Sequence, residues 1–346
     1  MHFIDSDSKN HIRISIWLLI LSIMAFLMIV IGGLTRLTES GLSMVDWNPI
    51  MGTIPPLSHL AWVEAFDNYK ATPEFQIVNK LMSLDEFKYI FWWEWFHRFF
   101  ARFMGMVFIF PFLYFWQKNN ISKKLFLTLT IVFLFGLFQA LVGWWMVKSG
   151  LRDNPYVSAY RLTFHLSNAL IIFCILSWTT LTSFFGKKTT KEVNTTINNF
   201  FHIGLFFLLI TIISGGFMAG THSGQSFNTF PLMNGKFVPE GYYFHEYGWL
   251  NSFENTAAIN FNHRWLASFT SLLVFSIHLY LLISTKYKGD NLSLILVLIT
   301  ISLQFFLGIL TLINNVPLFF ASLHQTNSVL LLASMLFAYH QHQYKK

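Results

Sequence analysis

Long apolar stretches alternate with short polar segments along almost the whole chain. Eight of these stretches reach the roughly 20 residues that an α-helix needs to cross the hydrocarbon core of a bilayer. The first is too long for the core of a signal peptide and lacks a clear cleavage site, so we expect it to remain as a helix. The pattern predicts an all-α, polytopic membrane protein with eight transmembrane helices, at about residues 14–34, 96–116, 124–146, 160–184, 200–219, 261–284, 292–313 and 318–340.

Basic residues indicate how these helices are oriented. Lysine and arginine gather at the two termini and in the segments 117–123, 185–199 and 285–291, whereas the long segments 35–95 and 220–260 are richer in acids. Short cytoplasmic loops of membrane proteins are enriched in lysine and arginine. Both termini are therefore predicted to be cytoplasmic and the two long segments to face outward, which an even number of spans permits.

Composition agrees with the membrane class. The chain is 54% hydrophobic and only 11% charged, against about 25% charged residues in soluble domains. A single cysteine, Cys174, excludes an intramolecular disulfide and any zinc or iron–sulfur site that needs several thiolates of this chain. The net charge of +7 is spread over short loops rather than one soluble face, so nucleic-acid binding is not expected.

The two halves of the chain repeat one another. Four features recur in the same order: Gly-Gly followed by Thr-x-Ser-Gly-x-Ser, a His-Arg pair, Gln-x-x-x-Gly, and His-x-x-Asn. They are Gly32-Gly33 and Gly215-Gly216, His97-Arg98 and His263-Arg264, Gln139/Gly143 and Gln304/Gly308, and His165/Asn168 and His324/Asn327. The repeat predicts two four-helix bundles, residues 1–190 and 191–346, of parallel topology about a pseudo-twofold axis along the membrane normal.

Four of the 13 histidines belong to this repeat: His97, His165, His263 and His324. Each lies near the start of a predicted helix that enters from the outside, so all four are expected at similar depth near the outer leaflet. Two imidazoles that face each other across a four-helix bundle can bind one haem iron axially. A lone intramembrane histidine is as often a hydrogen-bonded packing residue, but two repeated pairs favour one haem in each bundle. A zinc or copper site is less consistent, because no cysteine lies at this depth.

Arg98 and Arg264 follow two of these histidines directly. A guanidinium pairs well with carboxylates, so we expect both arginines to bind haem propionates at the outer surface. The alternative is that they anchor the helix ends at the membrane interface.

The repeats differ at one position that carries chemistry. Glu94 stands three residues before His97, on the same helix face, whereas Asn260 stands three residues before His263. A carboxylate at the edge of an apolar pocket can act as a general base or stabilise a cation. The alternative is a salt bridge to Arg98 or Arg102. The difference suggests a reactive haem in the N-terminal half and a structural or electron-carrying haem in the C-terminal half.

With these motifs the chain resembles the haem A synthase family, in the form found in alphaproteobacteria and mitochondria. The resemblance covers nearly the whole chain. It is carried by the segment from Gly32 through Trp47 to Pro55-Pro56, the run Phe91–Arg98, Asn262-His263-Arg264 and His324-Gln325-Thr326. Some bacterial relatives carry a cysteine pair in the outer loops, and its lack here excludes a mechanism that needs it.

The resemblance implies an oxidoreductase of the bacterial inner membrane that converts haem O to haem A by oxidising the C8 methyl group to a formyl. It implies that His263 and His324 ligate a haem b cofactor, with Arg264 beside it. It also implies that His97 and His165, with Arg98, hold the substrate haem O and that Glu94 is catalytic. The expected partners are haem O, membrane lipid, an electron acceptor, haem O synthase and oxidase assembly factors, with a homo-oligomer left open.

Two other functions compete with this one. A dihaem b-type cytochrome that only carries electrons explains both histidine pairs, but not the lone Glu94 or the long outer segments. A transporter fits a two-bundle repeat, but explains neither the depth of the histidines nor their pairing.

Overall fold

A computed structural model describes residues 10–46, 51–151, 155–186, 194–284, 287 and 289–344. Trp47 and the predicted boundary between residues 190 and 191 lie outside these ranges, as do the basic residues of 187–193. Within the described part the chain is helical and forms no strand beyond one isolated bridge, Met233 with Lys236. The all-α prediction is confirmed there. The long helices are α1 (His11–Leu37), α4 (Leu84–Gln117), α5 (Lys123–Gly150), α6 (Ala159–Phe185), α7 (Thr195–Gly220), α9 (Thr256–Ile283), α10 (Asn291–Ile313) and α11 (Leu318–Tyr344).

Among the described residues, seven of these long helices are long and apolar enough to cross a membrane, namely all except α11. The first half of α11 carries the polar run His324–Ser328, which lowers its hydropathy. The helix nevertheless packs against α1, α6, α7 and α10. The membrane class is thus supported by seven helices, and the eighth span stays a prediction.

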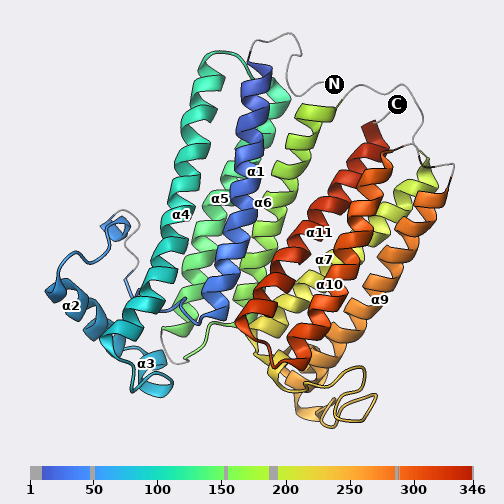
Figure 1. Cartoon of the computed structure of the whole chain (residues 1–346). Helices are drawn as coiled ribbons and strands as arrows, with labels where there is room; N and C mark the ends of the chain where they lie inside the picture. Colours follow the sequence, from blue (N-terminus) through green and yellow to red (C-terminus); the bar gives the residue numbers. More distant parts are fainter. Residues whose placement is uncertain are drawn as a thin grey trace.

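The long helices form two groups of four (Figure 1). In the first group α1 contacts α4 and α6, and α5 contacts α6; in the second, α7 contacts α9 and α11, and α10 contacts α9 and α11. The groups meet through α1 with α11, α6 with α7, and α6 with α11. Arg36 near the end of α1 also donates to the carbonyl of Ala219 near the end of α7 at 2.6 Å. Helix α1 begins and α11 ends at the same end of the molecule.

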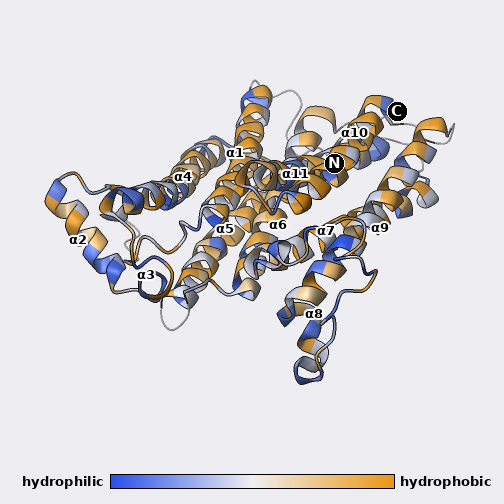
Figure 2. Cartoon of the chain, turned by 60° about the horizontal axis from the view of Figure 1, so that its bottom comes forward, coloured by the Kyte–Doolittle hydropathy of each residue, from blue (hydrophilic) through white to orange (hydrophobic). Residues whose placement is uncertain are grey.

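The opposite end carries the connecting segments. They include α2 (His59–Lys70), α3 (Pro73–Ile77), α8 (Asn251–Glu254) and the short 3-10 turns η1 (Met51–Thr53), η2 (Ser223–Gln225) and η3 (His245–Leu250). Figure 2 shows apolar residues along the long helices and hydrophilic residues gathered in these shorter ones. The segments predicted to lie outside the membrane are therefore partly helical.

Polar residues begin most of the long helices. Side chains of Ser83, Ser122, Asn194, Asn255 and Asp290 accept hydrogen bonds from backbone N–H groups of the first turn. At α4 the cap is a full capping box with Glu86. Helix α4 therefore begins well before the span predicted at 96–116. His97, expected near a helix start, lies roughly 3.6 turns into α4.

The main apolar core occupies the half of the molecule near the termini. It contains Leu18 and Leu21 of α1, Phe108 of α4, Leu176 of α6 and Met335 of α11, all at most 6% exposed. A second cluster, outside the helix groups, packs Phe66 and Tyr69 of α2 against Phe87 and Phe91 of α4. The four repeated histidines belong to neither cluster, so the half of the molecule that holds them is built differently.

Candidate functional site

The four repeated histidines form two pairs, one in each helix group. His97 of α4 and His165 of α6 are near enough to interact electrostatically, as are His263 of α9 and His324 of α11. The Nδ1 atoms of His97 and His165 are buried and have no hydrogen-bond partner. Leaving a buried ring nitrogen unpaired is costly unless a ligand uses it. Two buried imidazoles that face each other, each with an unused ring nitrogen, are typical of a site that holds a haem iron.

Each imidazole lies against a glycine of a neighbouring helix. A Cβ added to Gly32 would lie 3.2 Å from Cε1 of His97, and one on Gly215 would lie 3.3 Å from Cε1 of His263. The same holds for Gly143 against His165, at 3.0 Å, and for Gly308 against His324, at 2.9 Å. Any larger residue at these four positions would push the ring, so the repeated glycines set where the imidazoles stand.

The second glycine of each Gly-Gly pair packs the two groups together. A Cβ on Gly33 would overlap the side chain of Gln325, which donates to the carbonyl of Ile29 at 2.9 Å. A Cβ on Gly216 would lie 3.0 Å from Oγ1 of Thr163 on α6. In each pair the first glycine contacts a histidine and the second contacts a helix of the other group.

Repeated amides orient one histidine of each pair. Asn168 donates to Oε1 of Gln139 at 2.6 Å, and Nε2 of Gln139 lies 3.1 Å from Nε2 of His165. In the second group Asn327 donates to Oε1 of Gln304 at 2.8 Å, and Nε2 of Gln304 lies 3.2 Å from Nδ1 of His324. The repeat pointed to these four residues, but not to their hydrogen bonds with the histidines.

The other two histidines differ in their support. Nδ1 of His263 lies 2.7 Å from the hydroxyl of Ser214 on α7. The repeat places Ile31 at the matching position of α1, so His97 has no hydroxyl there. A hydrogen-bonded imidazole is held in one orientation and is more basic as a ligand. The second pair is therefore the more firmly built of the two.

Glu94 is buried, at 3% exposed, and its carboxylate is fully hydrogen-bonded. Oε2 accepts from the hydroxyl of Ser43 at 2.7 Å and from the backbone N–H of Met44 at 2.8 Å, and Oε1 accepts from Arg98 at 2.6 Å. The salt bridge to Arg98, which was the alternative interpretation of Glu94, is present. Asn260, its counterpart, donates to the carbonyl of Ser223 at 2.7 Å, and its own carbonyl oxygen has no partner.

The two arginines bind loop carbonyls. Besides Glu94, Arg98 donates to the carbonyl of Met44 at 3.1 Å, and Arg264 donates to those of Thr229 at 2.7 Å and Pro231 at 3.1 Å. Nη1 of Arg264 is buried without a partner. Each guanidinium thus holds the segment after the preceding long helix, and Arg264 keeps a free donor that suits a propionate.

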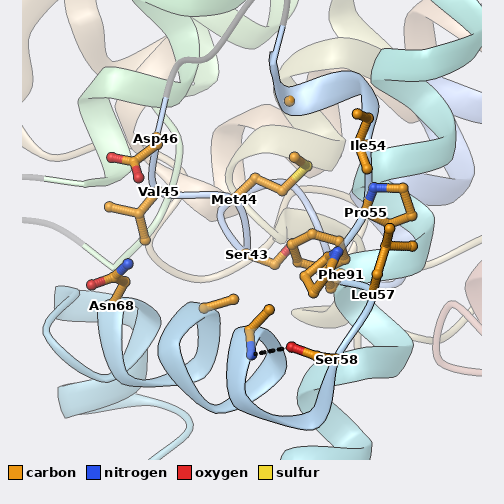
Figure 3. A pocket seen from close by; sticks show the side chains of 14 residues that line it. Ser43, Met44, Val45, Asp46, Ile54, Pro55, Leu57, Ser58, Asn68 and Phe91 are labelled. Carbon is orange, nitrogen blue, oxygen red and sulfur yellow. Dashed lines mark hydrogen bonds between the residues drawn. The ribbon is translucent and has the colours of Figure 1, made fainter.

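A hollow of about 530 Å³ lies outside the helix groups, between α2 and the segments 43–46 and 52–58 (Figure 3). Its wall is mostly apolar and includes Met44, Ile54, Leu57 and Phe91. Ser43 and Met44 line this hollow and also hydrogen-bond Glu94. Sequence reasoning missed the hollow, because it depends on how the segment after α1 folds back over α2.

Glu74 of α3 is a second buried acid that sequence reasoning missed. It is 6% exposed and accepts a 2.9 Å hydrogen bond from the hydroxyl of Tyr69, to which Asn79 also donates. Burial raises the pKa of Glu74 from its ordinary 4.5 to about 8. The packing of α2 and α3 that buries Glu74 cannot be recognised from a periodic pattern in the sequence.

Fold and site together define a polytopic helical membrane protein with a paired-histidine site in each helix group. The family model COX15-CtaA, described as cytochrome oxidase assembly protein, matches residues 15–336. The chain belongs to this family.

Three similar proteins are named haem A synthase. A haem A synthase of Nitrosomonas eutropha is 42% identical over 339 residues, which is 96% of this chain and 94% of that protein. One of Nitrosospira multiformis is 42% identical over 97% of this chain and 96% of that protein. One of Wolbachia pipientis wMel is 41% identical over 94% of this chain and 91% of that protein. The family resemblance inferred from the motifs is confirmed.

Proposed function

We propose that this chain is a haem A synthase, an oxidoreductase that converts the C8 methyl group of haem O to the formyl group of haem A. The observation that carries the proposal is the asymmetry between two otherwise matching histidine pairs. Only the N-terminal pair has a buried carboxylate, Glu94, one turn away; the other has the neutral Asn260. Full-length relatives named haem A synthase support the same conclusion.

The C-terminal pair would hold haem b as the resident cofactor. His263 and His324 would hold it, and a glycine and a hydrogen bond set the position of each ring. The buried free donor of Arg264 fits a propionate. A haem at this place would supply a one-electron redox centre. The chain's contribution here is to fix the ring orientations and to keep water away.

The N-terminal pair would hold the substrate haem O. His97 and His165 offer buried ring nitrogens without partners, which a substrate iron would occupy. Because His97 lacks the hydroxyl that supports His263, its hold on a ligand is weaker, which suits a group that must leave as product. Arg98 would lie at the propionate side but also binds Glu94.

Glu94 would be the catalytic residue. Converting a methyl to a formyl adds one oxygen from water and releases four protons and four electrons to an acceptor. Three hydrogen bonds, from Ser43, Met44 and Arg98, fix the carboxylate in place. So placed, it can stabilise positive charge that develops at the reacting carbon and take a proton from the attacking water.

The two groups would form pseudo-symmetric four-helix bundles, residues 1–190 and 191–346, with eight spans in the inner membrane and both termini cytoplasmic. The helix contacts support this arrangement: α1–α4, α5–α6 and α1–α6 match α7–α9, α10–α11 and α7–α11. The contacts between the groups match as well: if α1 is replaced by α7 and α11 by α6, the α1–α11 contact becomes the α6–α7 contact. Haem O synthase and oxidase assembly factors remain the proposed partners.

The test is haem extraction from membranes. The chain is expressed in a host that makes haem O but lacks its own haem A synthase, and the extracted haems are separated and identified by mass. Haem A should form with the wild-type chain and not with His97→Ala at equal protein level. If the wild-type membranes contain haem b in the protein but no haem A, the chain is an electron-carrying cytochrome instead.

A further inference from the structure

The interface between α4 and α5 is filled in one half and open in the other. Near the termini three aromatic pairs fill it: Phe108–Phe133 with ring centroids 6.0 Å apart, Phe112–Phe126 at 5.4 Å and Trp116–Phe126 at 5.4 Å. Towards the histidines no described aromatic pair joins these two helices. The matching helices α9 and α10 contact each other far more extensively than α4 and α5 do.

Small residues continue the α4 side of this interface. Gly105 stands three and seven residues before Phe108 and Phe112, and Ala101 stands seven before Phe108, so all share one helix side. Gly105 and Ala101 are exposed, and a Cβ added to Gly105 would meet nothing within 4 Å. The same helix side carries His97 one turn further on.

On α5 the facing residue is also a glycine. Gly136 lies three residues after Phe133, which contacts α4, and seven before Gly143, which contacts His165 on α6. Gly136 therefore lies on the side of α5 that faces α4 and α6, where it is exposed. A Cβ on Gly136 would meet nothing within 4 Å. The two open positions thus lie between the His97–His165 pair and the aromatic pairs near the termini.

The second helix group provides a comparison within the same chain. The repeat places Ile301 of α10 at the position of Gly136, with Gln304 and Gly308 matching Gln139 and Gly143. Ile301 is 2% exposed and belongs to the main core. Beside one histidine pair an isoleucine side chain fills the bundle, and beside the other the same position is empty.

Beyond Arg102, which follows Ala101 at the histidine end, the stretches of α4 and α5 around the opening carry no charged residue. Between residues 103 and 116 of α4, and between 125 and 147 of α5, the sequence has no charged residue. Phe103, Leu137 and Phe138 are more than 40% exposed around it. The opening therefore suits a long hydrocarbon that runs from the histidine pair into the surrounding lipid.

We infer that this opening, lined by Ala101, Gly105 and Gly136, receives the isoprenoid chain of the substrate and selects haem O over haem b. The inference rests on the proposed function. Haem O carries a hydroxyethylfarnesyl chain where haem b has a vinyl group, and burying each apolar carbon of that chain favours binding. Ile301 closes the equivalent space beside His263 and His324, where a haem without such a chain would sit.

The test compares two haems on the purified full-length protein with its C-terminal haem in place. Haem O and iron protoporphyrin IX are titrated separately, and the low-spin band of a bis-histidine haem is followed. Gly136→Ile installs the residue of the other bundle, and Gly136→Ala is the matched control. Both replacements favour helix over glycine, and the unchanged C-terminal haem signal reports that the variant is folded.

Gly136→Ile should weaken haem O binding at least about tenfold, because several chain carbons lose their burial. Its affinity for iron protoporphyrin IX should stay within about twofold of wild type, and Gly136→Ala should keep the preference for haem O. An unchanged preference in Gly136→Ile would overturn the inference and leave the opening to a lipid chain. Equal weakening for both haems would also overturn it. Failure of wild type to bind haem O at His97 and His165 would instead overturn the proposed function.

Discussion

The guanidinium of Arg98 donates a 2.6 Å hydrogen bond to Oε1 of Glu94, one turn earlier on α4. The carboxylate accepts two further hydrogen bonds, from Ser43 and Met44 in the segment after α1. The position of Glu94 thus depends on residues from two parts of the chain.

Replacing Glu94 by glutamine should abolish haem A formation while leaving the protein folded. Glutamine keeps the size and most of the hydrogen bonding, but removes the negative charge and the basicity. General acid–base contributions are typically about 10²–10⁴-fold, so haem A should fall to traces and haem O or a hydroxylated haem should accumulate. Haem extraction at matched protein level measures this. Asn260→Asp is the control and should create no second active site; near-normal haem A from Glu94→Gln would return Glu94 to a purely structural salt bridge.

His263→Ala should remove the low-spin haem b signal, because it deletes one of two strong-field ligands. His97→Ala or His165→Ala should abolish haem A formation but leave haem b in the other group. Reduced-minus-oxidised spectra of the purified variants separate these effects. Unchanged spectra in His263→Ala would remove that residue from the site, and loss of all haem from the His97 variant would indicate one shared site.

Gly308→Val should displace His324, because a Cβ at this position would already lie 2.9 Å from Cε1 of the ring. We expect a weakened or high-spin haem signal in the C-terminal group, read by the same spectra. Gly41→Ala is the control, since a Cβ at Gly41 would meet nothing within 4 Å. If Gly308→Val gives wild-type spectra, the contact between Gly308 and the ring does not determine the position of His324.

Glu74 should make the outer segment sensitive to pH. Its folded pKa of about 8 lies above the ordinary 4.5, so the folded state binds its proton more tightly than the unfolded state. Its favourable contribution is therefore full below about pH 4.5 and is lost as the pH rises towards about 8. Limited proteolysis of the α2–α3 segment should accelerate over that interval in wild type and less in Glu74→Gln. Identical pH profiles would contradict the assignment.

The repeat identified the four histidines that the structure brings together in pairs, but it predicted less about their surroundings. The repeat identified the histidines, Gln139 and Gln304, and the glycines, because each occurs twice at a fixed spacing. It did not reveal that Gly143 and Gly308 contact imidazoles, since a glycine has no side chain whose pattern shows what lies against it. The same repeat also contains the difference between Gly136 and its counterpart Ile301, but its meaning became clear only from the open space in the structure.

Other features depend on contacts that no local pattern encodes. The start of α4 has a readable signal, the capping box of Ser83 and Glu86, but hydropathy rises only later in the helix. The burial of Glu74 follows from how Tyr69 of α2 packs on Phe87 of α4 and hydrogen-bonds the carboxylate. The polar first half of α11 obscures its apolar character, because His324 and Asn327 hydrogen-bond Gln304 of α10 inside the helix group.

Leu18, Phe108 and Leu176 belong to one packed core that holds the helices together at the end of the molecule near the termini. At the other end the two helix groups differ: α4 and α5 contact each other little, whereas Ile301 fills the matching place in the C-terminal group. Under the proposed function, an exchange of substrate for product would therefore involve the histidine end of the N-terminal group and leave the core near the termini packed.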